Sequence, residues 1–455
     1  MSYLVQTFHI IKDPVHGAMQ FTDEENSWIK PFIDSHNFQR LRHIKQLGMA
    51  DLVFPGAVHT RFNHALGCCY IAGQIATKLN LEKHEHKIVM LAALLHDVGH
   101  GPFSHAFEGI FKHHAIAHED WTPLFLKDYL SEAFIKKFEE MNPGQTLHKE
   151  EFSLIKDLIM HRETPKKLLA DIVSSQMDAD RLDYLRRDSH FCGVTYGEYD
   201  FRWLLHCLTV IKTKEGVERL GITYKGIGVV EQYLMARRLM TRNVYFNGKK
   251  YAAEFLLTSF LKYLAKSIGQ EKEFPEIHEK NLARFLLKVT DLNQQIAHKK
   301  FSKKLKTQFL MDNYPLYKKL CDYDVYSMIR YFAGLDKKHV IVDIAKRLYS
   351  RQLPRVLQVD EKLLPRVQTL VKKLKEEKTI QSWQCCLIDL PHQAYQGSQD
   401  PILVINKMKQ IQNIHDNSLV LSGLSDKFEN SRLLMIDREI LSHPRLAGFL
   451  QALEG

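Results

Sequence analysis

The stretch that decides the fold is IVMLAALLHDVGHGPFSH, residues 88–105. Its apolar first half predicts a buried helix, and the glycines and proline that follow stop this helix abruptly. The polar pair His96 and Asp97 ends the helix, and burying each group without a partner costs roughly a few kcal/mol. A divalent metal ion offsets this cost, because adjacent His and Asp offer a nitrogen and an oxygen to one ion. A His-Asp pair alone is more often a hydrogen-bonded couple, but His100 and His105 nearby favour the metal site.

Composition limits the class of protein. The 455 residues are 45% hydrophobic and 25% charged, as in a globular protein of about two or three domains. Apolar runs stay below the roughly 18 residues of a membrane span, so we expect no membrane partner. No signal peptide is visible and the seven cysteines form no Cys-x-x-Cys, which predicts a cytoplasmic protein with free thiols. The net charge of +10 indicates an anionic partner such as nucleotide phosphates or nucleic acid, or simply a soluble surface.

Helical periodicity dominates the chain, so the predicted fold class is mainly α. Helices are expected at residues 34–47, 61–79 and 87–96, in three stretches between 142 and 188, and from 227 to about 263. β-branched residues on both sides of residues 214–216 predict a short β-hairpin. Short β-rich runs follow late in the chain, at residues 383–390, 401–405, 418–421 and 433–437. We therefore expect a helical core with an extension at residues 1–355 and a small α+β module at residues 356–455.

Metal-binding and charged residues gather in four segments, at residues 59–64, 96–97, 118–119 and 177–188. Arg61 and His64 are three residues apart and share a helical face. In the last segment Asp180, Tyr184 and Asp188 recur every four residues, which aligns them as one polar stripe on a helix. That stripe is either part of a metal site or a solvated face with ion pairs to neighbouring arginines.

The order of these motifs resembles the HD-domain metal-dependent phosphohydrolases. His64, the pair His96-Asp97, and Asp180 reproduce the H…HD…D signature of that family. Five segments resemble its deoxynucleoside triphosphate triphosphohydrolase (dNTPase) branch: DPVHG (13–17), FQRLRHIKQL (38–47), FPGAVHTRFNH (54–64), HDVGHGPFSH (96–105) and DADRLDY (178–184). The resemblance is specific from about residue 8 to about residue 250 and weaker to about residue 355. The sterile-alpha-motif domain of the human enzyme has no counterpart in the sequence.

The resemblance implies an HD-domain helical core that hydrolyses a dNTP to deoxynucleoside and inorganic triphosphate. It assigns one divalent ion per subunit to four ligands: His64, His96, Asp97 and Asp180. Mn, Mg, Fe, Zn and Ni all remain open for this ion, and an additional Mg would accompany the nucleotide. His105 would be the general acid for the leaving 5′-oxygen, with His100 beside the reacting phosphorus and Glu108 and His118 in support.

The resemblance assigns eight residues to substrate binding: Arg61, Gln46, Leu47, Arg181, Tyr184, Asp188, Tyr245 and Lys249. Arg61 would hold the α-phosphate through its planar fork of donors, and Arg181 would face the outer phosphates. Tyr184 and Asp188 would bind the deoxyribose 3′-hydroxyl opposite Gln46, while Leu47 would fill the place of a 2′-hydroxyl. Tyr245 and Lys249 would contact the base or outer phosphates, with a shift, because this chain has Asn-Gly-Lys-Lys at 247–250 where many relatives carry His-Lys.

The resemblance also bears on regulation and assembly. Asp34, Gln39 and Arg42 match positions where some relatives bind an activating guanine nucleotide, GTP or dGTP, between subunits. The alternative is that Gln39 and Arg42 are ordinary helix-surface residues. We expect a homodimer or homotetramer.

Two other functions stay open at this point. The same metal site would serve an HD-type phosphodiesterase or 5′-nucleotidase, and the fold would also suit a non-catalytic nucleic-acid-binding HD protein. Arg61, Arg181 and Lys249 favour a triphosphate substrate, because a monophosphate does not need so many cations. Weak single-stranded nucleic acid binding beside catalysis would show as a steep salt dependence.

Overall fold

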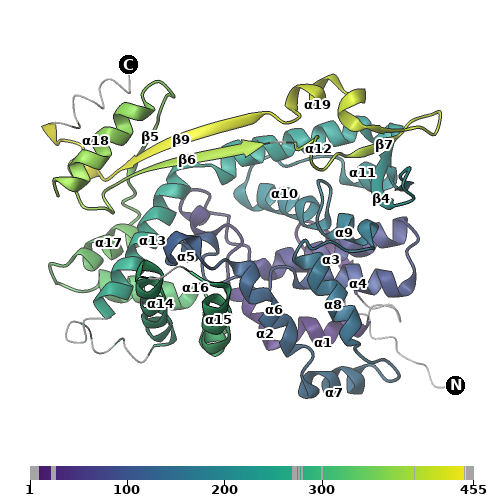
Figure 1. Cartoon of the computed structure of the whole chain (residues 1–455), viewed down its shortest axis with the longest axis horizontal. Helices are drawn as coiled ribbons and strands as arrows, with labels where there is room; N and C mark the ends of the chain where they lie inside the picture. Colours follow the sequence, from purple (N-terminus) through teal and green to yellow (C-terminus); the bar gives the residue numbers. More distant parts are fainter. Residues whose placement is uncertain are drawn as a thin grey trace.

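Helices make up most of the chain, which confirms the mainly α fold class (Figure 1). The computed structural model describes residues 10–21, 27–268, 274, 277, 280–298, 301–393, 395–444 and 446. The helices of the first part are α1 (Lys30–Ile33), α2 (His36–Gln39), α3 (Arg61–Lys78), α4 (Lys83–Leu95), α5 (His105–Glu108), α6 (His118–Asp128), α7 (Glu132–Met141), α8 (Lys149–Ile159), α9 (Lys167–Val173), α10 (Ala179–Cys192), α11 (Phe201–Cys207) and α12 (Ile227–Met240). The later helices are α13 (Gly248–Ile268), α14 (Asn281–His298), α15 (Lys303–Tyr317), α16 (Asp322–Ala333), α17 (Val340–Tyr349), α18 (Leu364–Glu376) and α19 (Leu419–Leu424). Within the described residues, no helix is both long enough and apolar enough to cross a membrane.

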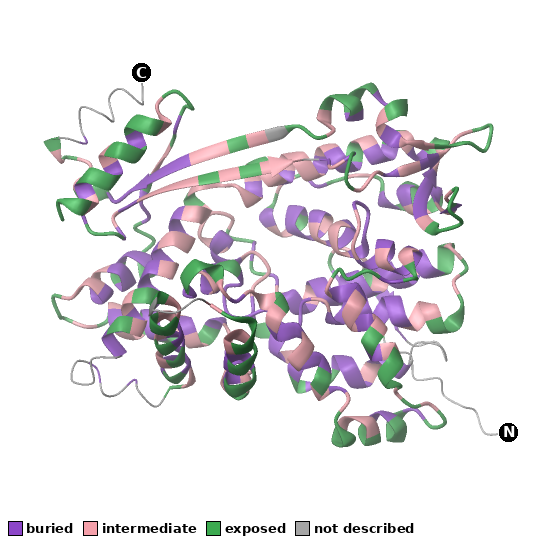
Figure 2. Cartoon of the chain, in the orientation of Figure 1, coloured by how far each residue is buried: buried purple, intermediate pink, exposed green. Residues whose placement is uncertain are grey.

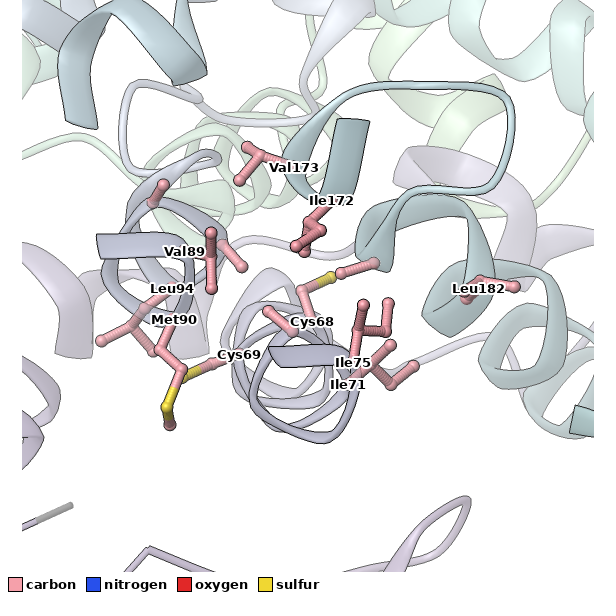
Figure 3. Packing of buried hydrophobic residues seen from close by; sticks show 14 of the residues in the cluster. Cys68, Cys69, Ile71, Ile75, Val89, Met90, Leu94, Ile172, Val173 and Leu182 are labelled. Atoms are coloured by element: carbon pink, nitrogen blue, oxygen red, sulfur yellow. The ribbon is translucent and has the colours of Figure 1, made fainter. Parts of the chain in front are cut away.

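Helices α3 and α4 lie at the centre of the larger core. The start of α3 at Arg61 and the end of α4 directly before His96 agree with the sequence prediction, although α4 begins at Lys83 rather than at residue 87. Figure 3 shows apolar side chains of α3 and α4 packed with residues of α9 and α10: Cys68, Cys69, Ile71, Ile75, Val89, Met90, Leu94, Ile172, Val173 and Leu182. This packing holds the polar C-terminal end of α4 against α3 and α10.

A second apolar core joins α6 to α13–α17, and Figure 2 shows buried residues where these helices meet and exposed residues on their outer faces. Trp121 of α6 stacks on Tyr317 of α15, with ring centroids 3.9 Å apart and ring planes 7° apart. Such a pair stabilises the fold by about 0.5–1.5 kcal/mol beyond its burial. The Tyr317 hydroxyl also donates a hydrogen bond of 2.8 Å to the carbonyl of Gly99. The second core therefore fixes the loop that follows His96-Asp97.

The strands form three small sheets in the described part of the chain. They are β1 (Ile10–Asp13) with β2 (Gly17–Gln20); β3 (Leu208–Lys212), β4 (Glu218–Thr223), β7 (Leu403–Ile405) and β8 (Ile411–Asn413) in that order; and β5 (Arg355–Gln358), β9 (Phe428–Ile436) and β6 (Cys385–Gln393) in that order. The predicted hairpin is confirmed as β3–β4, with Leu208 opposite Ile222. β7 extends it by pairing parallel to β4, with Leu403 opposite Gly221.

The C-terminal segments divide between two cores. α18 packs beside β6 and β9 around a small apolar cluster that includes Val367, Leu374 and Ile436. Ile402 and Val404 belong instead to the larger core that contains α3. The α+β content of the last hundred residues agrees with the sequence, and the boundary at residue 356 stays a prediction.

Two sequence predictions of elements are wrong. Residues 34–47 do not form one helix: α2 is followed by the 3₁₀ turn η2 (Arg40–His43), and Lys45 then bridges to Thr60 as extended chain. The apolar residues of this segment recur every three positions, which is the period of a 3₁₀ helix rather than the 3.6 of an α-helix. Residues 418–421 form no strand, because Ser418 caps α19 by accepting from the backbone N–H of Leu421.

Candidate metal centre and active site

One cavity of about 780 Å³ gathers most of the predicted site residues. The predicted residues that line it are Gln46, Leu47, Arg61, His64, His96, Asp97, His100, His105, His118, Asp180, Arg181, Tyr184, Asp188 and Tyr245. Segments from α3, the end of α4, α6 and α10 thus meet at one place, as the motif order predicts. Glu108 and Lys249 do not line this cavity.

The four predicted metal ligands face one another across short distances. His64 Nε2 lies 2.9 Å from Asp180 Oδ1 and 3.9 Å from Asp97 Oδ2. His96 Nε2 lies 3.4 Å from Asp97 Oδ1 and 3.7 Å from Asp180 Oδ1. Donor atoms that each bind one ion at about 2.1 Å are separated by about 3–4 Å. The spacing therefore fits a single divalent ion.

The orientation of the two imidazoles tests this fit independently. His96 Nδ1 donates to the carbonyl of Ala93 at 2.8 Å, and the buried His96 Nε2 has no hydrogen-bond partner among the described residues. His64 Nδ1 donates to Asp183 Oδ2 at 2.8 Å, which leaves Nε2 to face Asp180. An unpaired buried nitrogen is costly, and a metal ion would satisfy it. The residues present therefore fit a divalent ion, without selecting one metal.

Cys68 is a member of the cluster that the sequence analysis missed. It lies one helical turn after His64, and its Sγ is 3.4 Å from His64 Nδ1 and 3.5 Å from Nε2. His64, Cys68, His96 and Asp180 offer ligand atoms within 4.8 Å of one another. The signal in the sequence was the i, i+4 spacing of His64 and Cys68 on a helix. This spacing differs from the Cys-x-x-Cys pattern.

Arg61 and Asp97 form a buried ion pair at the metal cluster. Arg61 Nη1 donates to Asp97 Oδ2 at 2.5 Å, and its Nε and Nη2 donate to Ser104 Oγ at 3.0 and 2.7 Å. Ser104 has a φ of 51°, a left-handed conformation that costs free energy for a residue with a side chain. Burial alone would raise the pKa of Asp97, but Arg61, His96 and His100 hold that pKa well below its usual value. Asp97 is therefore ionised at neutral pH.

A second cluster of histidines surrounds Glu108. The rings of His100 and His118 stack with centroids 3.6 Å apart, and His118 Nδ1 donates to Glu108 Oε1 at 2.7 Å. His105, with 74% of its side chain exposed, has its Nδ1 3.4 Å from Glu108 Oε2. Burial, Arg61 and His118 lower the pKa of His100 well below its usual value, so its ring is neutral at pH 7. Burial would raise the pKa of Glu108, but His105 and His118 hold it well below the usual value.

Asp188 is the centre of a further hydrogen-bonded group on the same cavity. Asp188 accepts hydrogen bonds from His59 Nε2 at 2.7 Å and from the Tyr245 hydroxyl at 2.8 Å. Tyr184 and Leu47 line the same cavity, and the buried Gln46 Oε1 has no partner among the described residues. Arg181 forms an ion pair with Asp178 at its own helix end. His59, which fixes Asp188, was not predicted as a site residue.

The structure places Lys250, rather than Lys249, on the active-site cavity. Lys250 lines this cavity, and its Nζ lies 3.2 Å from Glu254 Oε1. Lys249 instead lines a separate cavity with Arg242, Arg355 and Arg438. Successive residues of a helix point about 100° apart, so Lys249 and Lys250 at the start of α13 face different cavities.

The three predicted nucleotide-activation residues lie together at the surface, outside the active-site cavity. Arg42 Nε donates to Gln39 Oε1 at 2.7 Å, and the guanidinium lies over the Phe62 ring, 3.5 Å from its centre. Asp34 pairs with Lys30 at 2.6 Å. An activating role for these residues stays a prediction.

Comparisons with known proteins agree with this geometry. The family model of the HD domain matches residues 61–188. The uncharacterized protein YwfO of Bacillus subtilis is 36% identical over 58% of this chain and 57% of its own length. The uncharacterized protein MG461 of Mycoplasma genitalium is 31% identical over 68% of this chain and 71% of its own. A zebrafish (Danio rerio) relative named deoxynucleoside triphosphate triphosphohydrolase SAMHD1 is 31% identical over 56% of this chain and 44% of its own.

A solved structure is similar over nearly the whole chain. The crystal structure of a phosphohydrolase from Bacteroides thetaiotaomicron matches with a TM-score of 0.73 and 29% identity, over 95% of this chain and all of that one. The chain spans little more than half of the Bacillus relative and less than half of the zebrafish relative. The matches confirm the resemblance seen in the sequence.

Proposed function

The chain belongs to the HD-domain family, and on this premise we propose that it is a metal-dependent hydrolase that converts deoxynucleoside triphosphates to deoxynucleosides and inorganic triphosphate. One observation carries the proposal: a single cavity is lined by all the residues to which these roles are assigned at the metal, the α-phosphate, the leaving oxygen and the sugar, namely His64, His96, Asp97, Asp180, Arg61, His100, His105, His118, Tyr184 and Asp188. The α-phosphate, the leaving oxygen and the sugar of a dNTP would each meet a group of matching chemistry.

Different residues of the chain perform different parts of the reaction at the α-phosphate. A divalent ion held by His64, His96, Asp97 and Asp180 would activate a water molecule and polarise a phosphate oxygen. Arg61, fixed by Ser104, offers charge to the α-phosphate as negative charge spreads in the transition state. His105 donates a proton to the leaving 5′-oxygen.

The histidines around Glu108 support that proton transfer. Glu108 contacts both His105 and His118, which holds the donor in place. His100 stays neutral beside Asp97 Oδ1, 3.2 Å away. Its ring lines the cavity, where it would border the reacting phosphorus.

Specificity for deoxyribose rests on the opposite end of the cavity. Asp188 accepts from His59 and Tyr245, so its carboxylate is held in place to receive the 3′-hydroxyl, together with Tyr184. Leu47 places apolar surface where a ribose would carry its 2′-hydroxyl. An apolar wall of this kind discriminates by about 10- to 200-fold.

The lysines at the start of α13 give a matched pair of variants. We expect Lys250→Ala to raise the KM for a dNTP by about 10- to 150-fold with little change in kcat, because Lys250 lines the cavity and a charged contact contributes about 1.5–3 kcal/mol. Lys249→Ala should change neither constant by more than about twofold. Steady-state kinetics of the two variants decides which lysine serves the substrate, and the reverse pattern would return the role to Lys249.

Turnover of the four dNTPs, singly and mixed, with Mn²⁺ or Mg²⁺, tests the proposed function. We expect deoxynucleoside and inorganic triphosphate to appear together on chromatography, and a chelator to stop the reaction. Stepwise release of phosphate, or activity only on monophosphates, would move the protein to the phosphodiesterase or 5′-nucleotidase class. Activity confined to mixtures that contain dGTP would support nucleotide activation through Asp34, Gln39 and Arg42, and sedimentation with dGTP would show whether a homodimer or homotetramer accompanies it.

A further inference from the structure

We propose that the turn between β1 and β2 belongs to the metal centre, because it positions the ligand His64 through the buried carboxylate of Asp183. The inference rests on the proposed function only in taking His64 as a metal ligand. It gives a role to the DPVHG segment at residues 13–17, for which neither the active-site chemistry nor the substrate contacts account.

Asp183 is the centre of this arrangement. Its side chain is 0% exposed and accepts four hydrogen bonds. His64 Nδ1 donates to Oδ2 at 2.8 Å, and Arg187 donates to Oδ2 through Nε at 2.8 Å and to Oδ1 through Nη2 at 3.0 Å. His16 Nε2 donates to Oδ1 at 2.6 Å. A carboxylate has about four lone-pair directions, so Asp183 is fully occupied and cannot rotate away from His64.

The β1–β2 turn is joined to the hydrogen bonds around Asp183 through Asp13 and Arg187. Asp13 Oδ1 accepts from the backbone N–H groups of Val15 and His16 at 2.9 and 3.0 Å, which fixes the turn. Arg187 donates to both oxygens of Asp13, at 2.7 and 3.2 Å. The turn is thereby tied to the same guanidinium that holds Asp183.

The His16 ring is held as a donor toward Asp183. Its Nδ1 faces Arg186 Nη1 at 3.4 Å, and a guanidinium nitrogen only donates. His16 Nδ1 is therefore the acceptor, and Nε2 carries the proton given to Asp183. The ring also packs near Tyr70 and Phe201, with centroids 5.7 and 6.5 Å away, so its plane is fixed.

The consequence for the metal centre follows from the chemistry of imidazole. When Nδ1 of His64 donates to a carboxylate, Nε2 carries the lone pair and the ring cannot turn. Asp183 itself does not touch the ion site, since His64 lies between them. It is a positioning residue, and His16 positions it in turn.

The Mn²⁺ affinity of the metal-stripped, full-length protein, measured by calorimetry and by electron paramagnetic resonance, tests the inference. We expect Asp183→Asn to weaken Mn²⁺ binding by about 10- to 100-fold. His16→Ala should weaken it by about tenfold, and His16→Gln should recover most of the loss, because its amide N–H can reach the place of His16 Nε2. Asp157→Asn, which alters a surface ion pair with Arg162, is the control and should bind as the wild type does.

The melting temperature of each metal-free variant separates positioning from a purely structural role. Folded Asp183→Asn and His16→Ala proteins that bind Mn²⁺ with wild-type affinity would overturn the inference. If Asp183→Asn does not fold, the contrast between His16→Ala and His16→Gln decides: a loss restored by Gln supports positioning, and equal affinities overturn it. A wild-type protein that binds Mn²⁺ but hydrolyses no dNTP would overturn the proposed function alone, and one that binds none of Mn²⁺, Mg²⁺, Fe²⁺, Zn²⁺ and Ni²⁺ would overturn both.

Discussion

Asp97→Asn is expected to lower the kcat/KM for dNTP hydrolysis by at least about a thousandfold while the protein stays folded. Asn has nearly the shape of Asp, and its carbonyl oxygen can still accept from Arg61. Asn cannot supply a charged oxygen to the metal cluster. In the wild type, Asp97 Oδ1 lies 3.4 Å from His96 Nε2 and Asp97 Oδ2 lies 3.9 Å from His64 Nε2. Asn also leaves the buried Arg61 charge without its counter-ion, which changes the position of the donors meant for the α-phosphate.

Triphosphate release and bound metal, measured on the same sample, check this expectation. Asp157→Asn makes the same chemical change in a surface ion pair, in which Asp157 Oδ1 lies 3.2 Å from Arg162 Nη1. This variant should keep full activity. Asp157→Asn should melt close to the wild type, and Asp97→Asn should fold but melt at a lower temperature, because it leaves the buried Arg61 charge unpaired. An Asp97→Asn protein that retains more than about a tenth of the activity would show that Asp97 is not at the reacting centre.

The parts of the fold that could be predicted from the sequence are those with a strong local signal. The apolar run before His96 and the two glycines and proline after it locate the end of α4, and the β-branched residues around residues 214–216 locate the β3–β4 hairpin. The parallel pairing of Leu403 with Gly221 could not be predicted, because nothing local in either segment specifies a partner so far away in the sequence. The prediction of an α-helix at residues 34–47 was wrong, because the apolar residues there recur every three positions, which is the period of a 3₁₀ helix.

The candidate site shows the same division. The ordered motifs identified most of the residues that line the cavity, because these residues lie in distinctive local patterns, whereas Glu108 and Lys249 do not line it. The supporting residues have no such pattern. Asp183 is one of several acidic residues on α10, and only the packing of α10 on α3 and on the β1–β2 turn shows that it contacts His64 and His16. The choice between Lys249 and Lys250 depends on the rotational orientation of α13, which the sequence alone does not specify.

Gly67→Ala is the stability change with the largest expected effect. Gly67 lies in α3 where α10 crosses it, and a Cβ at this position would lie 1.9 Å from Asp183 Oδ1 and 2.5 Å from Arg187 Nη2. Both partner side chains are fully buried and hydrogen-bonded to each other, so neither can move aside without breaking the network around His64. We expect a loss of more than about 3 kcal/mol in the free energy of unfolding, together with weaker Mn²⁺ binding.

Gly73→Ala, in the same helix, separates this steric effect from helix propensity. The atoms nearest to its Cβ would be the end of Met90 at 3.3–3.4 Å and His86 Nε2 at 3.5 Å, and a flexible methionine can shift at little cost. Alanine also favours a helix over glycine by about 0.5–1 kcal/mol, so Gly73→Ala should melt near the wild type. Thermal unfolding of the metal-free proteins measures the difference. Equal melting temperatures for the two variants would mean that α3 and α10 do not approach as closely as the Asp183 network requires.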